Sequence, residues 1–423
     1  MDRSLALKER WVHTWTAMPM LTEPEHFPPK PFVQDAAIFP NTTIRQTVRI
    51  SIGTQQSLRL RVSNAFGAHN LTITEATVAL AASNQSGTNA IQPGSVRNVT
   101  FGAERDITIP PGALGVSDPI HLGVSLPART ALSISLFLKD GQGGGQITSH
   151  PGSRTTSYFA FGNRVSDVAF ADDSVKTAIH WWTIRYYISG VEVFVSRPSR
   201  ALALIGDSIT DGLGSVTNGD TRWPDLLFVR LQKHPRTEGI AVLNSAAGGN
   251  RILQDGTGPS LLSRLDRDIL AVSGVESVLI FSGVNDIGVA AAEPAVQEDL
   301  AKGMIAALRQ IVTRLHAQGI SVYGATITPF GRLPTSLDKI DSEEGVTPYS
   351  NPVRETTRQK VNDFIRSSGV FDAVVDFDRV LSDPLVPYGL ASEYDSGDHL
   401  HPNQRAFQAL ADAIPLDLLK GSN

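Results

Sequence analysis

The sequence of 423 residues contains no cysteine, and this absence excludes several kinds of chemistry. Without thiols there is no disulfide framework, no thiolate metal ligand and no cysteine nucleophile. No apolar run approaches the roughly 20 residues with which a helix crosses a bilayer, so we expect no membrane span. The charge is also small, because 37 basic side chains stand against 42 acidic ones, a net charge of −5. A balance of this kind offers no attraction for nucleic acid.

The residues that are present indicate a folded chain of two domains. Hydrophobic residues make up 41% of the sequence and charged residues 19%, which is typical of proteins with sizeable cores. The first ten residues lack the apolar stretch of a signal peptide. We therefore expect a cytoplasmic protein if the chain is full-length and a secreted one if a leader was removed. The oligomeric state stays open.

Residues 1–199 alternate between apolar and polar side chains. Leu58, Leu60 and Val62 face one way in such a pattern, and the same alternation recurs over residues 132–138 and 191–195. Strict alternation predicts strands with one buried face, and Gly- and Pro-rich turns separate them. We therefore predict that residues 1–199 form an antiparallel β-rich sandwich domain.

Residues 200–423 alternate instead between short apolar segments and amphipathic ones. This pattern predicts an α/β domain with a parallel sheet whose two faces are covered by helices. In such sheets, ligands bind beyond the carboxyl ends of the strands. The predicted strands are residues 201–205, 240–243, 278–281, 320–323 and 373–375.

Polar segments follow three of these strands, and a fourth lies near the end of the chain. Ser208 ends a Gly-Asp-Ser turn after the first strand, and Asp398 and His401 share the late segment. A serine hydroxyl is a weak nucleophile that needs a neighbouring base. We predict that His401 takes the proton of Ser208 and that Asp398 orients the imidazole. His399, two residues away from His401, is the alternative base.

The two other segments supply hydrogen-bond donors for an oxyanion. Gly249 offers a backbone N–H that a ligand can approach closely, Asn285 offers a side-chain amide, and the N–H of Ser208 is a third donor. Taken singly, each of these residues would also suit a turn or a helix cap. Their occurrence together, each at a strand end or turn, favours acyl-transfer chemistry.

The four segments resemble the four sequence blocks of the SGNH/GDSL hydrolases. The match consists of Gly206-Asp207-Ser208, Gly249, Gly283-Val284-Asn285-Asp286 and Asp398-His399-Leu400-His401, with Ile209 where the first block usually has Leu. The resemblance implies a flavodoxin-like three-layer α/β/α domain with a five-stranded parallel sheet. It also implies a serine esterase without a cofactor, in which Ser208, Asp398 and His401 form the triad and Gly249 and Asn285 complete the oxyanion hole.

Other segments are similar to a narrower branch of that family. They are Trp11–Trp15, Arg61–Gly67, Thr326–Gly331 and Tyr394–Pro402, together with the β-rich first half, which is jelly-roll-like in that reading. The branch includes arylesterases and acylhydrolases associated with xylan-degrading gene clusters. It implies short acyl or aryl esters as substrates, acetyl groups on carbohydrates among them, and an accessory first domain that shapes the site or binds carbohydrate.

Further residues are candidates for contact with substrate. We predict that Asp207, Arg251 and Trp223 line the site, although Arg251 would equally pair with a carboxylate and Trp223 would equally pack at a helix end. The stretch Pro329–Ser350 has the length of a lid or binding loop, and a plain excursion explains it equally well.

Three alternatives remain open from the sequence. The acyl group would pass to an alcohol instead of water in an acyltransferase, or the chain would bind carbohydrate with a vestigial hydrolase domain. The acidic and imidazole side chains of residues 395–401 would suit a metallohydrolase, but no His-Glu-x-x-His motif supports one. We predict no metal, no nucleic-acid partner, and a small-molecule or carbohydrate ester as the substrate.

Overall fold

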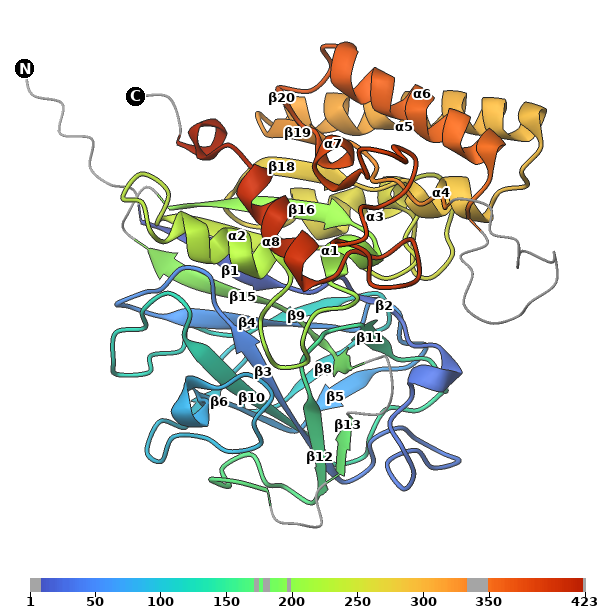
Figure 1. The fold of residues 1–423 in the computed structure, drawn as a ribbon. Helices are drawn as coiled ribbons and strands as arrows, with labels where there is room; N and C mark the ends of the chain where they lie inside the picture. The colour runs from blue at the N-terminus through green and yellow to red at the C-terminus, as the bar shows by residue number, and fades with distance from the viewer. Residues whose placement is uncertain (1–8, 171–174, 178–182, 196–198, 333–348, 421–423) are drawn as a thin grey trace, which may run out of the picture. The chain divides into compact units, whose positions relative to one another are not determined.

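The computed structural model describes residues 9–170, 175–177, 183–195, 199–332 and 349–420. The chain forms two compact units (Figure 1). The first contains Met1–Ala201, Val216–Asp220 and Glu238–Leu243, and the second contains Leu202–Ser215, Thr221–Thr237 and Asn244–Asn423. Of the stretch predicted as a lid or an excursion, residues 333–348 lie outside the described residues.

The first unit consists of antiparallel sheets, which confirms the predicted β-rich half. Its largest sheet has six strands in the order β13 (Val175–Thr177), β12 (Ser157–Phe161), β3 (Thr42–Arg49), β10 (Ala131–Leu138), β6 (Glu75–Leu80) and β7 (Arg97–Val99). A four-stranded sheet runs β1 (Arg10–Thr16), β15 (Ile188–Val195), β4 (Leu58–Ser63) and β9 (Leu114–Val116). The smaller sheets are β14 (Ile184–Tyr186), β11 (Thr148–Pro151) and β2 (Met20–Leu21), and the pair β5 (Leu71–Ile73) and β8 (Ile107–Ile109).

Aromatic side chains form part of the core of this unit. Phe39 packs edge-on against Tyr186 with ring centroids 4.9 Å apart, and Phe159 contacts both rings. All three are almost fully buried. Aromatic pairs in these tilted geometries add stabilisation beyond the apolar area that they bury.

The five predicted strands of the second half form one parallel sheet, as expected. The strand order is β17 (Ile240–Asn244), β16 (Arg200–Gly206), β18 (Val275–Phe281), β19 (Ser321–Ala325) and β20 (Ala373–Val375). This 2-1-3-4-5 order is that of flavodoxin-like folds, in which ligands bind where the strand order reverses. Residues 201–205 of β16 are almost fully buried, as a strand covered on both faces should be.

Helices cover this sheet in two groups. α2 (Trp223–Leu231) packs against α8 (Gln404–Ala413), and α5 (Pro294–His316) packs against α6 (Pro352–Ser367). Figure 1 shows the two pairs on different sides of the strands. The shorter helices are α1 (Ser208–Asp211), α3 (Leu261–Leu265), α4 (Val284–Val289) and α7 (Phe377–Leu381).

Local sequence explains where these helices begin. Pro294 and Pro352 occupy the first turns of α5 and α6, where a missing N–H costs no hydrogen bond. Asn351 and Asn403 cap α6 and α8, each accepting a hydrogen bond from a backbone N–H of the first turn. α3 continues as a π-helical turn over Asp266–Leu270.

Candidate active site

Ser208 lies at the carboxyl end of β16, at a tight turn from strand to helix. It is the first residue of α1, and its side chain is nearly buried. Asp207 caps the helix by accepting a hydrogen bond of 3.1 Å from the N–H of Ile209. A Cβ at Gly206 would lie 2.7 Å from the carbonyl oxygen of Phe281, so only glycine fits before the turn.

The structure brings Ser208 together with two residues almost 200 positions away. Ser208 Oγ lies 2.8 Å from His401 Nε2, and His401 Nδ1 lies 2.6 Å from Asp398 Oδ2. Asp398 Oδ1 also accepts the backbone N–H groups of Leu400 at 3.0 Å and His401 at 2.8 Å. The carboxylate therefore holds both the ring and the backbone of His401 in place.

The charge on Asp398 is stabilised by these contacts. Partial burial would raise the pKa of this carboxyl, but the hydrogen bonds and the charge of His401 outweigh it. The pKa of Asp398 consequently lies well below its usual range, and the side chain stays ionised at neutral pH. An ionised carboxylate at this position stabilises an imidazolium ion when it forms.

Of the two predicted oxyanion residues, Gly249 has a positive φ, and Asn285 comes two residues after a glycine with a positive φ. Gly249 has φ +69°, and a Cβ there would lie 2.8 Å from Thr257 Oγ1. Both the backbone conformation and the lack of space therefore disfavour any side chain at this position. Asn285 is in the first turn of α4, after Gly283 with φ +124°. Its Nδ2 donates to the carbonyl oxygen of Asn250 at 3.1 Å.

Hydrogen bonds join the four motif segments to one another. The segment after β17 is tied to the first by the N–H of Ala247, which donates to Gly206 O at 3.3 Å. Asp286 ties the third segment to the second, because its carboxylate accepts the N–H groups of Ile252 at 2.8 Å and Leu253 at 3.0 Å. Asp286, at the end of the third predicted strand, thus holds the backbone of Ile252 and Leu253 in place.

Two buried carboxyls lie in these segments. Burial, with a smaller contribution from the nearby charges of Asp286 and Asp211, raises the pKa of Asp207 to about 7, although the backbone hydrogen bond from Ile209 opposes this effect. Burial also raises the pKa of Asp286, although the N–H groups of Ile252 and Leu253 oppose this effect. Both carboxyls are therefore harder to ionise than an ordinary aspartate.

The remaining candidates have contacts that do not involve the triad. Arg251 donates to the backbone carbonyl of Asp255, and Trp223 is fully buried with its ring edge-on to Phe377 at 5.7 Å. His399 pairs with Asp395 at 2.6 Å, separately from the His401–Asp398 pair. Contact of Asp207, Arg251 and Trp223 with substrate stays a prediction.

Sequence reasoning missed one residue of this region, Tyr349. Its hydroxyl donates to Asn285 Oδ1 at 3.0 Å, across 64 positions of the chain. The only signal in the sequence is a tyrosine inside a long polar stretch, and no spacing relates it to Asn285. Contacts of this kind become visible only in three dimensions.

Within the described part of the chain, neither a metal-binding cluster nor a membrane-spanning helix is present. No group of three or more His, Asp or Glu side chains is placed there to hold a metal ion. None of the helices described combines the length and the apolar character that crossing a membrane requires.

Comparison with known families gives a match over the second half of the chain. A family model described as GDSL-like lipase/acylhydrolase matches residues 202–414, which contain all four motif segments. No curated protein matches the sequence significantly.

Solved structures are similar to about half of this chain. A GDSL-like lipase from Bacteroides thetaiotaomicron is 15% identical, with a TM-score of 0.37 over 52% of this chain and 88% of that one. An acetyl xylan esterase is 18% identical, with a TM-score of 0.35 over 50% and 96% of the two chains. A variant of an acetyl-xylooligosaccharide esterase from Geobacillus is 21% identical, with a TM-score of 0.35 over 51% and 91%.

Proposed function

The chain belongs to the GDSL-like lipase/acylhydrolase family and is a carboxylic ester hydrolase, and we propose that it works through an acyl-enzyme intermediate on Ser208. The observation that carries the proposal is the continuous line of hydrogen bonds from Ser208 through His401 to Asp398. A serine next to an imidazole that a carboxylate orients is the arrangement that activates a hydroxyl for acyl transfer.

In the first half of the reaction, Ser208 Oγ attacks the carbonyl carbon of the ester. The proton of the hydroxyl passes to His401 Nε2, which lies 2.8 Å away, and Asp398 stabilises the resulting imidazolium. The carbonyl oxygen gains the negative charge and accepts hydrogen bonds from the N–H groups of Ser208 and Gly249 and from Asn285 Nδ2. When the bond to the alcohol breaks, His401 returns the proton to the departing oxygen.

The second half repeats these steps with water. His401, neutral again, takes a proton from a water molecule, whose oxygen attacks the carbonyl carbon of the acyl-enzyme. The same three donors stabilise the second tetrahedral intermediate. Its collapse releases the carboxylic acid, and the proton on His401 returns to Ser208 Oγ. No cofactor enters this cycle.

The proposed substrates are esters of short acyl or aryl groups, including acetyl groups on carbohydrates. Membership of the family supports ester hydrolysis. The preference for small acyl groups is inferred from the resemblance to the branch of the family that has a β-rich first half. We propose residues 200–423 as the catalytic part and residues 1–199 as an accessory part that shapes the site or binds carbohydrate.

The test is replacement of the nucleophile. Ser208→Ala should lower kcat for p-nitrophenyl acetate by at least about 10³-fold, because the residual rate comes from the oxyanion donors and binding alone. Ser367→Ala is the matched control, because it removes an exposed hydroxyl at the end of α6 that only donates to Asp363 O. Wild-type activity in Ser208→Ala would rule out the mechanism. Acyl chains of rising length and acetylated xylan then define the substrate.

A further inference from the structure

We propose that Tyr349 is a positioning residue for the oxyanion site, because its hydroxyl holds the side-chain amide of Asn285 in the orientation that presents Nδ2 to the substrate. This inference rests on the proposed function, in which Asn285 is an oxyanion donor. Tyr349 acts through Asn285 and is given no contact with substrate.

The two partners of Asn285 define which way its amide points. The carbonyl oxygen of Asn250 can only accept, so the atom 3.1 Å from it is Nδ2. The other end of the amide is then Oδ1, and it accepts the hydroxyl of Tyr349 at 3.0 Å. The amide is held at both ends, and Nδ2 has a second hydrogen for an oxyanion.

Tyr349 itself packs closely against α4. A Cβ at Gly288 would lie 2.2 Å from the ring carbon Cδ2 of Tyr349, so the ring lies directly on the glycine backbone. Phe330 packs edge-on against the ring at 6.3 Å. Burial raises the pKa of the Tyr349 hydroxyl, and the nearby charge of Asp207 adds to this effect, so the group stays protonated and remains a donor.

The contact should matter more in the transition state than in the bound substrate. Negative charge on the carbonyl oxygen develops only as the tetrahedral intermediate forms, and a misaligned donor loses most of its value there. Without the hydroxyl, Oδ1 loses its partner and the amide is held only by Asn250. The loss should therefore appear in kcat and leave KM nearly unchanged.

Tyr349→Phe tests this inference, because it removes the hydroxyl and keeps the ring. We expect kcat for p-nitrophenyl acetate to fall about tenfold, with KM within about twofold of wild type. The matched control is Tyr323→Phe, which removes another hydroxyl of the second unit, one that donates to Leu418 O at 3.0 Å. It should leave kcat unchanged. A kcat of Tyr349→Phe equal to wild type would overturn the proposal.

Two further measurements separate positioning from general packing. In an Asn285→Ala background, Tyr349→Phe should cause no further loss of kcat, because the amide that it positions is absent. Full additivity would overturn the proposal. Phenylboronic acid, which forms a tetrahedral adduct with an activated serine, should bind Tyr349→Phe more weakly by the same factor as the fall in kcat. Unchanged affinity would also contradict it.

The outcome for Ser208 distinguishes this inference from the proposed function. If Ser208→Ala is inactive and Tyr349→Phe behaves as wild type, the acyl-enzyme mechanism stands and only the role of Tyr349 is refuted. If Ser208→Ala keeps full activity, the mechanism fails, and the positioning role fails with it.

Discussion

At the scale of single residues, the proposed nucleophile Ser208 follows directly after a buried acid, Asp207. Asp207 is almost fully buried and caps α1 through the N–H of Ile209. Its pKa is raised to about 7, because burial penalises the ionised form and Asp286 and Asp211 add repulsion. The folded state therefore keeps a proton on Asp207 over a range of pH in which the unfolded chain has released it.

This shift makes the stability of the protein depend on pH. The contribution of neutral Asp207 to stability is full below the ordinary pKa of 3.8 and is lost as the pH rises to about 7. Asp207→Asn keeps the capping oxygen and cannot ionise. We expect the free energy of unfolding of the variant to increase relative to that of wild type as the pH rises from 4 to 8, by at most about 4 kcal/mol.

The measurement is urea unfolding of both proteins at several pH values. Asp286, whose pKa is also raised, is present in both chains, and only its interaction with the charge of Asp207 differs between them. If the difference between the two free energies does not change over that range, Asp207 is already ionised in the folded protein at low pH.

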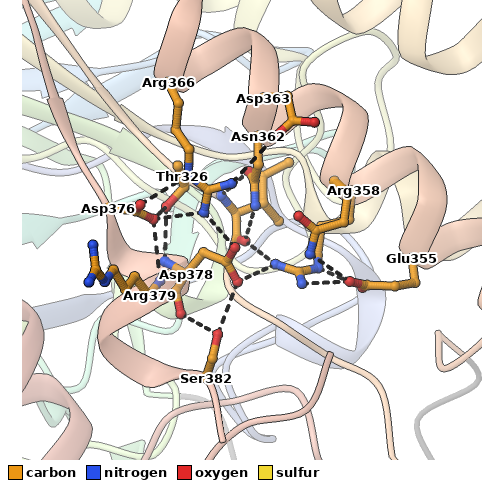
Figure 2. Close-up of polar contacts among 12 residues, drawn as sticks. Thr326, Glu355, Arg358, Asn362, Asp363, Arg366, Asp376, Asp378, Arg379 and Ser382 are labelled. Carbon is orange, nitrogen blue, oxygen red and sulfur yellow. Dashed lines mark hydrogen bonds and ion pairs between the residues drawn. The ribbon is translucent and has the colours of Figure 1, made fainter. Parts of the chain in front are cut away.

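At the scale of elements, α6 is joined to the edge of the sheet by a buried polar network (Figure 2). Arg358 in α6 is fully buried and donates to Asp378 at 2.5 Å, to Glu355 at 2.7 Å and to the carbonyl oxygen of Ile327 at 2.8 Å. Asn362 bonds both the N–H and the carbonyl of Ile327. The network thus holds the segment after β19 against α6 and the start of α7.

Removal of Arg358 should be strongly destabilising. Arg358→Met fills similar space but leaves the Ile327 carbonyl without this donor. The buried carboxylate of Asp378 then keeps Arg366 as its charged partner, beside the hydroxyl of Ser382. Breaking a buried ion pair from one side costs about 3–5 kcal/mol, and we expect a loss near the lower end. Lys302→Met is the control, because Lys302 pairs with Asp299 and Glu298 on the exposed surface of α5 and should lose less than about 1 kcal/mol. Equal losses in urea unfolding would contradict this view of the network.

At the scale of the whole molecule, the order of the chain does not follow the division into compact units. Residues Val216–Asp220 come shortly after Ser208, yet they belong to the first unit. Asn218 Oδ1 accepts the N–H of Thr156 at 2.8 Å, and Asp220 Oδ2 accepts Arg49 Nε at 2.6 Å. The first unit is therefore completed by residues that follow Ser208 in the sequence.

The Asp220 contact should contribute measurably to stability. Asp220 has φ +49°, a conformation that Asn also tolerates, so Asp220→Asn removes the charge without backbone strain. The ion pair with Arg49 is mostly buried, and the same oxygen accepts Ser86 Oγ. We expect a loss of about 1–2 kcal/mol in the free energy of unfolding. Asp299→Asn, on the exposed face of α5, should change it by less than about 0.5 kcal/mol, and a similar loss in both would refute the assignment.

Much of this protein was predictable from the sequence, because the signals concerned are local. Alternation of period two and segments of helical period depend on neighbouring residues, and they predicted the β-rich half and all five strands of the parallel sheet. The four motif segments were equally visible, since each consists of consecutive residues such as Gly206-Asp207-Ser208 and the run from Asp398 to His401. Membership of the family followed from those segments.

The tertiary structure alone decided the contacts between distant positions. The hydrogen bond from Tyr349 to Asn285, the burial of Arg358 within an amphipathic helix and the placement of Val216–Asp220 with the first unit have no local signature. A polar side chain is buried only where the fold supplies its partners, and those partners come from other elements of the chain. Sequence therefore determined which elements form and which residues are candidates for the chemistry, and packing determined which residues hold those candidates in place.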